Sequence, residues 1–521
     1  MALSSGIETH DHACPCAACA AAGKDEAYDP FAATYVAPTE ESGAGLISGR
    51  AWSDIEITYA FPTTAAAYDT DLSAAGVQYG SGEPASGFAA LNAPQITAVV
   101  AALAQFAAVS GLSFAKAAPE EATLRFAQST APTTAWGYYP SAFDEGGDAW
   151  FGTANGWYAD PVRGGYGWHT IIHEIGHTLG LKHGHDGGGF GALGYDEDTM
   201  EHSVMTYRSF VGDPLQGGYS NEAGGYAQTL MQADIAALQQ LYGANYAHMA
   251  GDTHYAWDPQ TGETFIDGAG QGAPLDNRVF MTVWDGGGTD TWDFSAYGEQ
   301  VTIDLAPGAG AAMETQLAHL NRYEAGGGDA IHAERAVYAA RLFKGDDRAL
   351  IENAVGGDGD DVIRGNRAEN HLSGGGGMDS LFGFAGRDIL IGKNGADFLS
   401  GGRGGDKLKG GGWHDELQGG AGWDILFGGA GDDLLIGGAG KDKMHGGVGR
   451  DLFRFGAGDG VDRIFDFEVG EDRIDLTTLA TGFDALDIVD TANGARVNVA
   501  DLGIRLIGVD ADELSGADFL F

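Results

Sequence analysis

The sequence predicts a two-domain chain in which an α+β domain is followed by an all-β parallel β-roll. The chain has 521 residues, which exceeds the size that one hydrophobic core usually serves. In the first part, segments with the two-residue apolar periodicity of strands are interspersed with segments that have the apolar periodicity of helices, as is typical of a mixed fold. A glycine-rich part with a nine-residue period follows, and such repeats stack as short parallel strands. We therefore expect a leader over residues 1–45 and domains over residues 46–248 and 249–521.

Two strands and three helices are predicted in the first domain. Apolar residues alternate over residues 55–61 and 122–128, which predicts strands. Apolar residues three and four positions apart predict helices over residues 93–111, 166–183 and 229–243. The last of these ends on a glycine, which is a common helix terminator.

The composition is strongly acidic, with 74 Asp and Glu residues against 28 Lys and Arg residues and a formal net charge of -46. Such a charge repels nucleic acid and anionic membrane surfaces, so neither is expected as a partner. Dense carboxylates favour hard divalent cations, which indicates calcium. No segment reaches the ~20 apolar residues that span a bilayer, and no conventional N-terminal signal peptide is recognisable.

The most specific motif is HExxHxxGxxH, formed by His173, Glu174, His177, Gly180 and His183. On a helix, residues four apart share one face, so two histidines can bind one Zn²⁺ with the glutamate beside them. Gly180 can adopt the left-handed conformation that ends the helix and returns the third histidine to the metal. Three protein ligands leave the fourth position open for water.

This arrangement predicts a zinc-dependent endopeptidase. Catalytic zinc lowers the pKa of its bound water to ~7, and Glu174 is expected to act as general base and then general acid toward the leaving amine. The alternatives are a non-peptidase zinc hydrolase, an inactive relative that only holds metal, or histidines without a metal role. An intact Glu174 argues against the inactive form.

All three cysteines, Cys14, Cys16 and Cys19, lie in the leader, so no disulfide is expected in the rest of the chain. The leader has no sustained periodicity, which favours a propeptide trimmed during maturation. As an alternative, a thiol, His10 or His12 fills the open zinc position before removal. The sequence leaves the role of the cysteines open.

Residues 356–454 repeat the pattern GGxGxDxUx, in which U is a large apolar residue, at starts that differ by multiples of nine. Glycine turns expose carbonyl oxygens and the aspartate supplies a carboxylate, as in calcium-binding β-rolls. A disordered linker would not keep both residues in a fixed phase. The side chains expected to point inward include Val362, Leu381, Leu390, Leu399, Leu408, Ile425 and Leu434.

Several structural calcium ions are therefore expected, bound by carboxylates and by carbonyls of glycines such as Gly356, Gly374 and Gly376. Asn370 replaces one aspartate and Trp413 one glycine, so the sites around them are expected to be weak or empty. The predicted carboxylate ligands are Asp361, Asp379, Asp388, Asp397, Asp406, Asp415, Asp424, Asp433, Asp442 and Asp451.

The zinc motif is that of the metzincins, and the segment SVMTY at residues 203–207 resembles their Met-turn. Together with TLMQADIAALQQLYGAN, VWDGGGTDTWDFS and the final DFLF, it makes most of residues 46–521 similar to the serralysin family. The resemblance implies that Met205 lies under the zinc and that Tyr207 is a further, displaceable zinc ligand with a catalytic role. It also implies that residues 146–151 form the sheet edge that receives an extended substrate, with broad specificity.

The resemblance implies further properties outside the zinc site. A tail of one acidic and three apolar residues, 518–521, is similar to a C-terminal secretion signal, so an extracellular monomer exported by a one-step transporter is expected. Substrate proteins and a proteinaceous inhibitor are the other partners implied. A further calcium site is implied at Gly251, Thr253, Asp285, Gly287, Asp290 and Glu352.

Two rival interpretations stay open at the level of the sequence. In one, the chain is a calcium-binding surface or adhesion protein whose zinc domain is only a binding module. In the other, it is a metallohydrolase that acts on one particular protein instead of on proteins in general. Hydrolysis of casein separates the first rival from a peptidase, and substrate profiling separates the second.

Overall fold

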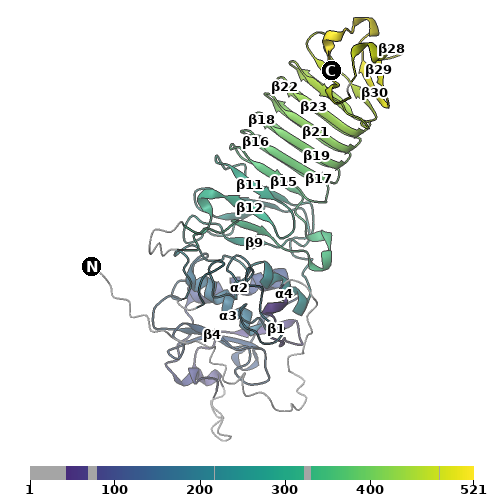
Figure 1. The fold of residues 1–521 in the computed structure, drawn as a ribbon. Coiled ribbons are helices and arrows are strands. Elements are labelled where there is room, and N and C mark those ends of the chain that lie inside the picture. The colour runs from purple at the N-terminus through teal and green to yellow at the C-terminus, as the bar shows by residue number, and fades with distance from the viewer. Residues whose placement is uncertain (1–42, 69–78, 216–217, 322–329, 480) are drawn as a thin grey trace, which may run out of the picture. The chain divides into compact units, whose positions relative to one another are not determined.

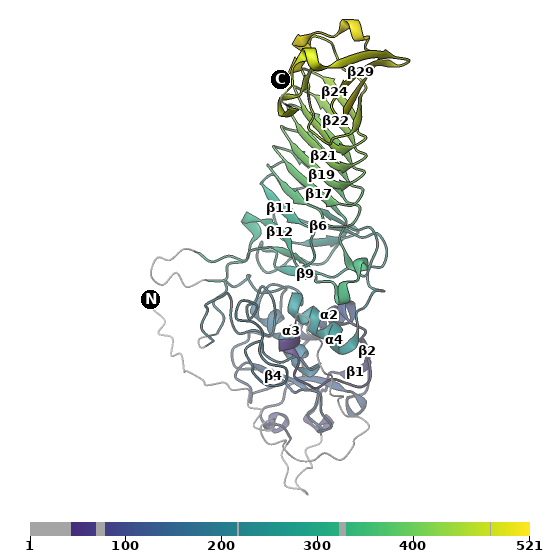
Figure 2. The ribbon, with the colours of Figure 1, turned by 45° about the vertical axis from the view of Figure 1, so that its right-hand side comes forward.

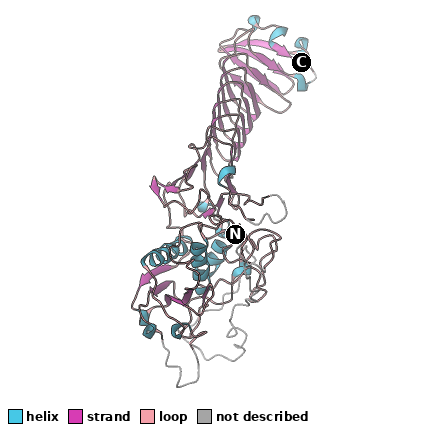
Figure 3. Ribbon diagram, turned by 90° about the vertical axis from the view of Figure 1, so that its left-hand side faces the viewer, coloured by secondary structure: helices cyan, strands magenta, loops and turns pink. Residues whose placement is uncertain are grey.

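The structure is a computed structural model that describes residues 43–68, 79–215, 218–321, 330–479 and 481–521. The cysteines and histidines of the leader lie outside the described residues. The chain forms two compact units. The first unit consists of the chain up to His248 with residues 273–284 and 317–345, and the second contains the remainder. Helices belong mainly to the first unit, and long stacks of strands to the second (Figure 3).

A five-stranded sheet with the order β2-β1-β3-β5-β4 forms one layer of the first unit. Its strands β1, β2, β3 and β5 run parallel, and β4 is antiparallel to β5. The bounds are β1 Glu56–Ala60, β2 Ser113–Lys116, β3 Leu124–Ser129, β4 Ala135–Gly137 and β5 Ala149–Gly152.

The edge of this sheet differs from the prediction. Residues 146–151 were expected to form the edge strand, but β5 lies inside the sheet, between β3 and β4. The strand β4 forms the edge. Its three residues are too few to show a period of two, so the sequence pattern does not reveal it.

Three helices pack in the first unit: α2 Ala93–Val109, α3 Tyr166–Thr178 and α4 Gln232–Tyr242 (Figure 2). All three were predicted, and α3 ends earlier than expected. Gly180 follows it with φ +97°, the left-handed conformation proposed from the sequence. The parallel strands β9 Met281–Val283 and β13 Val337–Ala339 also belong to this unit. No helix among the described residues is long and apolar enough to cross a membrane.

The second unit is a parallel β-roll built from two long sheets, whose strands follow one another alternately along the chain (Figure 1). The first sheet, in spatial order, contains β28 Asp487–Thr491, β29 Gly494–Val499, β30 Leu502–Ile507, β26 Val461–Ile464, β24 Lys443–Val448, β22 Ile425–Ala430, β20 Lys407–Gly412, β18 Ile389–Asn394, β16 His371–Gly376, β14 Asn353–Val355, β10 Thr291–Asp293, β6 His254–Trp257, β7 Thr264–Ile266 and β8 Ala269–Gly270. The second contains β31 Phe519–Leu520, β27 Arg473–Asp475, β25 Leu452–Arg454, β23 Leu434–Gly440, β21 Glu416–Gly422, β19 Phe398–Gly404, β17 Ser380–Ala385, β15 Val362–Arg364, β11 Val301–Asp304 and β12 Gly310–Met313.

One apolar side chain per turn fills the space between the two sheets. The inward residues are fully buried, and they are Ile363, Leu372, Leu381, Leu390, Leu399, Leu408, Leu417, Leu426, Leu435, Met444 and Phe453. Val362, Ile425 and Leu434 were predicted to point inward, but each stands one position earlier and is only half-buried. Their repeats carry two apolar residues after the aspartate, and strand alternation selects the second.

Candidate metal centres

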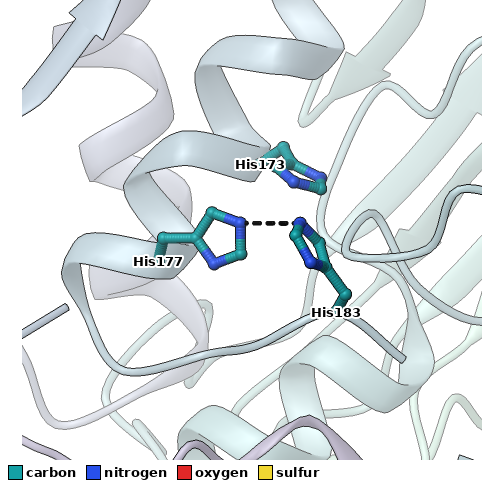
Figure 4. A group of neighbouring side chains, drawn as sticks. All are labelled: His173, His177 and His183. Atoms are coloured by element: carbon teal, nitrogen blue, oxygen red, sulfur yellow. Dashed lines mark hydrogen bonds between the residues drawn. The ribbon is translucent and has the colours of Figure 1, made fainter. Parts of the chain in front are cut away.

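Three histidines of the first unit converge on one point (Figure 4). His173 and His177 lie one turn apart on α3, and His183 follows the turn at Gly180. Each offers a ring nitrogen within 4.8 Å of the others, and Nε2 of His177 lies 3.1 Å from Nε2 of His183. All three side chains are buried. The structure therefore brings together the histidines that the motif predicted as zinc ligands.

The outward nitrogens of the two helical histidines are held by backbone carbonyls. Nδ1 of His173 lies 2.7 Å from the carbonyl oxygen of Val204, and Nδ1 of His177 lies 2.7 Å from that of Leu181. A carbonyl can only accept, so each Nδ1 carries the proton and each Nε2 keeps a free lone pair. This orientation suits a metal ligand.

The third histidine is oriented by a carboxylate. Nδ1 of His183 lies 3.3 Å from Oδ2 of Asp186, which favours the same tautomer. Burial lowers the pKa of His177 to about 3 and holds that of His173 well below its usual value, so both rings are neutral near pH 7. Three imidazole nitrogens are a donor set that catalytic Zn²⁺ takes. The residues present therefore fit zinc.

Glu174 is buried beside the histidines, and its Oε2 has no hydrogen-bond partner among the described residues. Burial raises the pKa of its carboxyl group to about 8, and a hydrogen bond from the backbone of Gly137 acts in the opposite direction. Gly137 ends the edge strand β4, and a Cβ there would lie 2.4 Å from the Glu174 carbonyl oxygen. A glycine at this position thus permits the close approach of β4 to the site.

Met205 is fully buried against α3. A Cβ on Gly176 of α3 would lie 2.6 Å from the Met205 sulfur, so the helix approaches the methionine closely only because a glycine stands there. The segment is anchored by Asp234 at the start of α4, whose carboxylate accepts hydrogen bonds from the Ser203 hydroxyl (2.6 Å) and the Val204 amide (2.8 Å). Sequence reasoning did not single out Asp234.

Tyr207 lies against two of the histidines. Its ring centroid is 4.4 Å from that of His183 and 5.9 Å from that of His173, with which it is nearly parallel. The structure thus places the predicted fourth protein ligand at the rim of the cluster.

A second kind of site occurs in the roll, where aspartates form two rows. Each aspartate Oδ1 accepts the backbone N–H of the residue that holds the same position two nine-residue repeats earlier in the chain. Among the described residues, Oδ2 has no partner in Asp379, Asp388, Asp397, Asp406, Asp415, Asp424, Asp433, Asp442, Asp451 and Asp462. Buried carboxylate oxygens without a partner are costly unless a cation or a proton satisfies them.

The chemistry of these rows fits calcium. Burial, with a smaller contribution from neighbouring carboxylates, raises the pKa of Asp379 and Asp415 to about 7. Glycines line the same turns: a Cβ on Gly374 would lie 2.1 Å from Oδ2 of Asp379. A Cβ on Gly356 would lie 2.2 Å from Oδ2 of Asp361. Carboxylate and carbonyl oxygens in such turns are the ligands that Ca²⁺ prefers.

The rows extend beyond the nine-residue period. Asp462 accepts the Asp442 amide at 2.8 Å, and Asp472 accepts the Asp451 amide at 2.9 Å. The prediction missed both because their spacings are 20 and 21 residues instead of 18. A search for an aspartate two positions before a buried apolar residue would have found them.

At the N-terminal end of the rows, the predicted ligand Asp361 and the predicted exception Asn370 have protein partners. Both oxygens of Asp361 already accept backbone N–H groups, from Val301 and Gly357. Asn370 occupies an aspartate position, and its amide donates to the Glu352 carbonyl oxygen at 2.8 Å. A neutral amide that donates a hydrogen bond here reduces the negative charge of this turn.

The further calcium site implied by the family resemblance also brings its residues together. Asp290 Oδ1 accepts the Thr253 amide at 2.8 Å, the Asp290 amide donates to Glu352, and Asp290 Oδ2 has no described partner. Burial raises the pKa of Asp290 to about 8 and that of Glu352 to about 7. The pKa of Asp285 is raised too, again chiefly by burial. The Asp285 carboxylate accepts the Gly287 amide at 2.9 Å, and the Thr253 hydroxyl donates to the Gly251 carbonyl.

A buried triad of histidines beside a glutamate, combined with a calcium-type parallel roll, is the arrangement of a metallopeptidase with a calcium-binding repeat domain. The RTX calcium-binding nonapeptide repeat matches residues 355–383, 382–417, 400–435, 418–453 and 428–462. The family described as Peptidase M10 serralysin C terminal matches residues 244–312.

Curated relatives point the same way. The chain is 33% identical to "Serralysin G" of Dickeya chrysanthemi over 303 residues, 55% of this chain and 56% of the relative. It is 31% identical to "Metallopeptidase AprA" of Pseudomonas marginalis over 346 residues, 62% and 64% of the two chains. It is 35% identical to "Serralysin" of Proteus mirabilis over 255 residues, 47% and 44%. The alignments thus span between 44% and 64% of these relatives. The chain is thus similar to the serralysins over about half of its length, as the sequence motifs predicted.

Proposed function

We propose that this chain is a zinc-dependent endopeptidase that hydrolyses peptide bonds in proteins. The observation that carries the proposal is the convergence of three buried Nε2 lone pairs beside the unpartnered carboxylate of Glu174. His173, His177 and His183 would hold the metal, with Tyr207 as a further ligand. Zinc bound there supplies Lewis acidity, which lowers the pKa of water to ~7 and polarises a peptide carbonyl.

Glu174 is the residue that moves the proton. Its carboxylate accepts a proton from the attacking water as the water oxygen bonds to the carbonyl carbon. It then delivers that proton to the amide nitrogen as the carbon–nitrogen bond breaks. Burial raises its pKa, so the carboxylate is a stronger base than an exposed glutamate and is matched to a reaction near neutral pH.

The edge strand β4 is the proposed substrate-binding element. No described strand pairs with its outer edge, and its residue Gly137 contacts Glu174. An extended peptide can add to such an edge through backbone hydrogen bonds, which tolerates many side chains. We therefore expect broad specificity.

The test compares the wild-type protein with Glu174→Gln in casein hydrolysis, with zinc content measured on both. We expect the variant to keep zinc and to lose activity by about 10³-fold or more, since proton transfer is worth roughly 10²–10⁴. Glu201→Gln is the matched control, because Glu201 is also a carboxyl group whose pKa is raised by burial. An active Glu174→Gln, or full activity after zinc removal, would contradict the proposal.

We further propose that the roll binds calcium through its two aspartate rows and the site at Asp285 and Asp290. Asp415→Asn keeps the shape of the side chain but removes one charge in the centre of a row. We expect fewer bound ions by mass spectrometry under native conditions and a higher calcium concentration for folding. Unchanged stoichiometry and folding would assign the ions to other residues.

Export to the extracellular medium by a one-step transporter is proposed from the tail. In the folded chain Phe519 is buried and β31 pairs with β27, while the Asp518 carboxylate accepts the Gly470 amide. A transporter can therefore read the tail only before the roll folds. Deletion of residues 518–521 is expected to keep the protein inside producing cells, and normal export of this deletion would refute a C-terminal signal.

A further inference from the structure

Basic residues line one row on the outer face of the first sheet. The row contains Lys407 of β20, Lys443 of β24, Arg463 of β26, Arg505 of β30 and Arg496 of β29. Ile425 of β22 stands in register between the two lysines. On the remaining neighbouring strands, each cation is paired in register with the next cation. Six consecutive strands thus carry five aligned cations.

These side chains all point away from the interior of the roll. Strand alternation settles this, because the next residues, including Leu408, Met444 and Ile464, are fully buried. Lys443, Arg463 and Arg505 are exposed. Within the described part of the chain, none of the five cations forms an ion pair with a carboxylate, although acidic residues far outnumber basic ones.

The row is unfavourable for the isolated protein. Neighbouring strands lie ~4.8 Å apart, and like charges directly opposite one another destabilise a sheet. Arg496 stands directly opposite Arg505, and its Nε has no hydrogen-bond partner among the described residues. The outer face of the second sheet has no such row: at the matching positions stand Ser380, Phe398 and Glu416.

We propose that this row binds a linear acidic polysaccharide, with one carboxylate or sulfate group for each of several cations. The cations lie in single file, which matches an extended polyanion better than the broad surface of a membrane. Flanking aromatic rings do not offer the faces that nucleobases need for stacking. Those of Phe427, His445 and Phe465 stack on one another at 4.8 Å, with interplanar angles of 13° and 12°.

The inference does not depend on the proposed peptidase activity, because the row lies in the roll and none of its residues is a predicted ligand. A bound acidic glycan would hold the protein at the cell surface or matrix to which that glycan belongs. Binding should weaken as the salt concentration rises from about 0.05 to about 0.3 M, because the Debye length falls to less than half over this range.

The test is a fluorescence titration of the full calcium-loaded chain with heparin, with neutral dextran as the uncharged probe. The variant Lys443→Gln/Arg463→Gln/Arg505→Gln is expected to bind heparin about tenfold more weakly, since electrostatic attraction drives the association. The control Arg364→Gln/Arg403→Gln/Arg473→Gln removes the same charge elsewhere on the roll and is expected to change affinity less than about twofold. Casein hydrolysis should be equal in all three proteins.

Equal weakening by both triple variants would show attraction by net charge alone and overturn the site. Tighter binding of single-stranded DNA or of anionic phospholipid vesicles than of heparin, lost in the same variant, would overturn the choice of glycan. Should the triple variant fail to fold, Arg505→Gln alone is measured. An unchanged heparin affinity in that folded variant would likewise overturn the proposal.

Discussion

Replacement of Asp234 tests whether the histidine cluster is positioned from the start of α4. The Asp234 carboxylate is fully buried and accepts three hydrogen bonds: from the Ser203 hydroxyl, the Val204 amide and the Met231 amide, at 2.6, 2.8 and 2.9 Å. Val204 in turn accepts the Nδ1 proton of His173. A change at Asp234 should therefore reach the metal through one backbone peptide.

The magnitude follows from the donors left without a partner. Asp234→Ala leaves three buried donors, each costing about 1–3 kcal/mol when unsatisfied, so we expect a loss of about 3–9 kcal/mol in unfolding free energy. Asp234→Asn keeps the shape and one acceptor oxygen, so its cost should be about 1–2 kcal/mol. Loss of an orienting partner typically lowers metal affinity by about 10–100-fold.

The assay is competition for zinc with a chromogenic chelator, together with denaturant unfolding of the metal-free protein. Asp148→Asn is the control, because Asp148 is equally buried and hydrogen-bonded, but to Arg125 of β3 and to Tyr79. We expect this control to lose stability and to keep its zinc affinity within about twofold. A destabilised Asp234→Asn with unchanged zinc affinity would refute the proposed connection to His173.

Three further outcomes are expected. Gly176→Ala should cost about 1–3 kcal/mol in denaturant unfolding, because its Cβ would lie 2.6 Å from the buried Met205 sulfur, and a cost below about 0.5 kcal/mol would show that the methionine moves aside. Trp413→Gly should stabilise the roll by about 1 kcal/mol, because Trp413 is 69% exposed and holds φ +85°, and thermal unfolding with calcium measures this. Calcium removal should unfold the roll at pH 8 and leave more strand signal in circular dichroism at pH 5. Burial raises the folded pKa of Asp379, Asp388, Asp415 and Asp424 from 3.8 to about 6–7. Their protonation therefore stabilises the metal-free roll at low pH, and this stability is lost as the pH rises through that range. Equal unfolding at both pH values would contradict this explanation.

Much of the zinc cluster could be predicted because its geometry is local. Four-residue spacing on a helix and a glycine turn place His173, His177 and His183 with little help from the rest of the chain. The partner of the outer nitrogen of His173 is not local, in contrast to those of His177 and His183. Val204 and Asp234 come from segments with no periodic relation to α3, so only tertiary structure reveals them.

The roll shows the opposite limitation. Its nine-residue repeat is obvious in the sequence, but which apolar residue of each repeat faces inward is not. Two adjacent apolar residues at 425 and 426 both fit the pattern, and only the pleat of the strand decides that Leu426 faces inward. The period also hides the continuation of the rows, because insertions shift Asp462 and Asp472 out of register while their backbone contacts persist.

The contacts of the rows have a direction. Each aspartate amide donates to a carboxylate that lies later in the chain, so a turn is complete only when the turn two registers ahead is in place. Asp462 and Asp472 close the two rows, and Oδ2 of Asp472 is itself satisfied by the Glu468 amide. The C-terminal end of the roll can therefore order without a later turn, whereas every earlier turn depends on its successor. A chain that leaves a cell with its C-terminus first would meet external calcium with the turns in the order in which they can form.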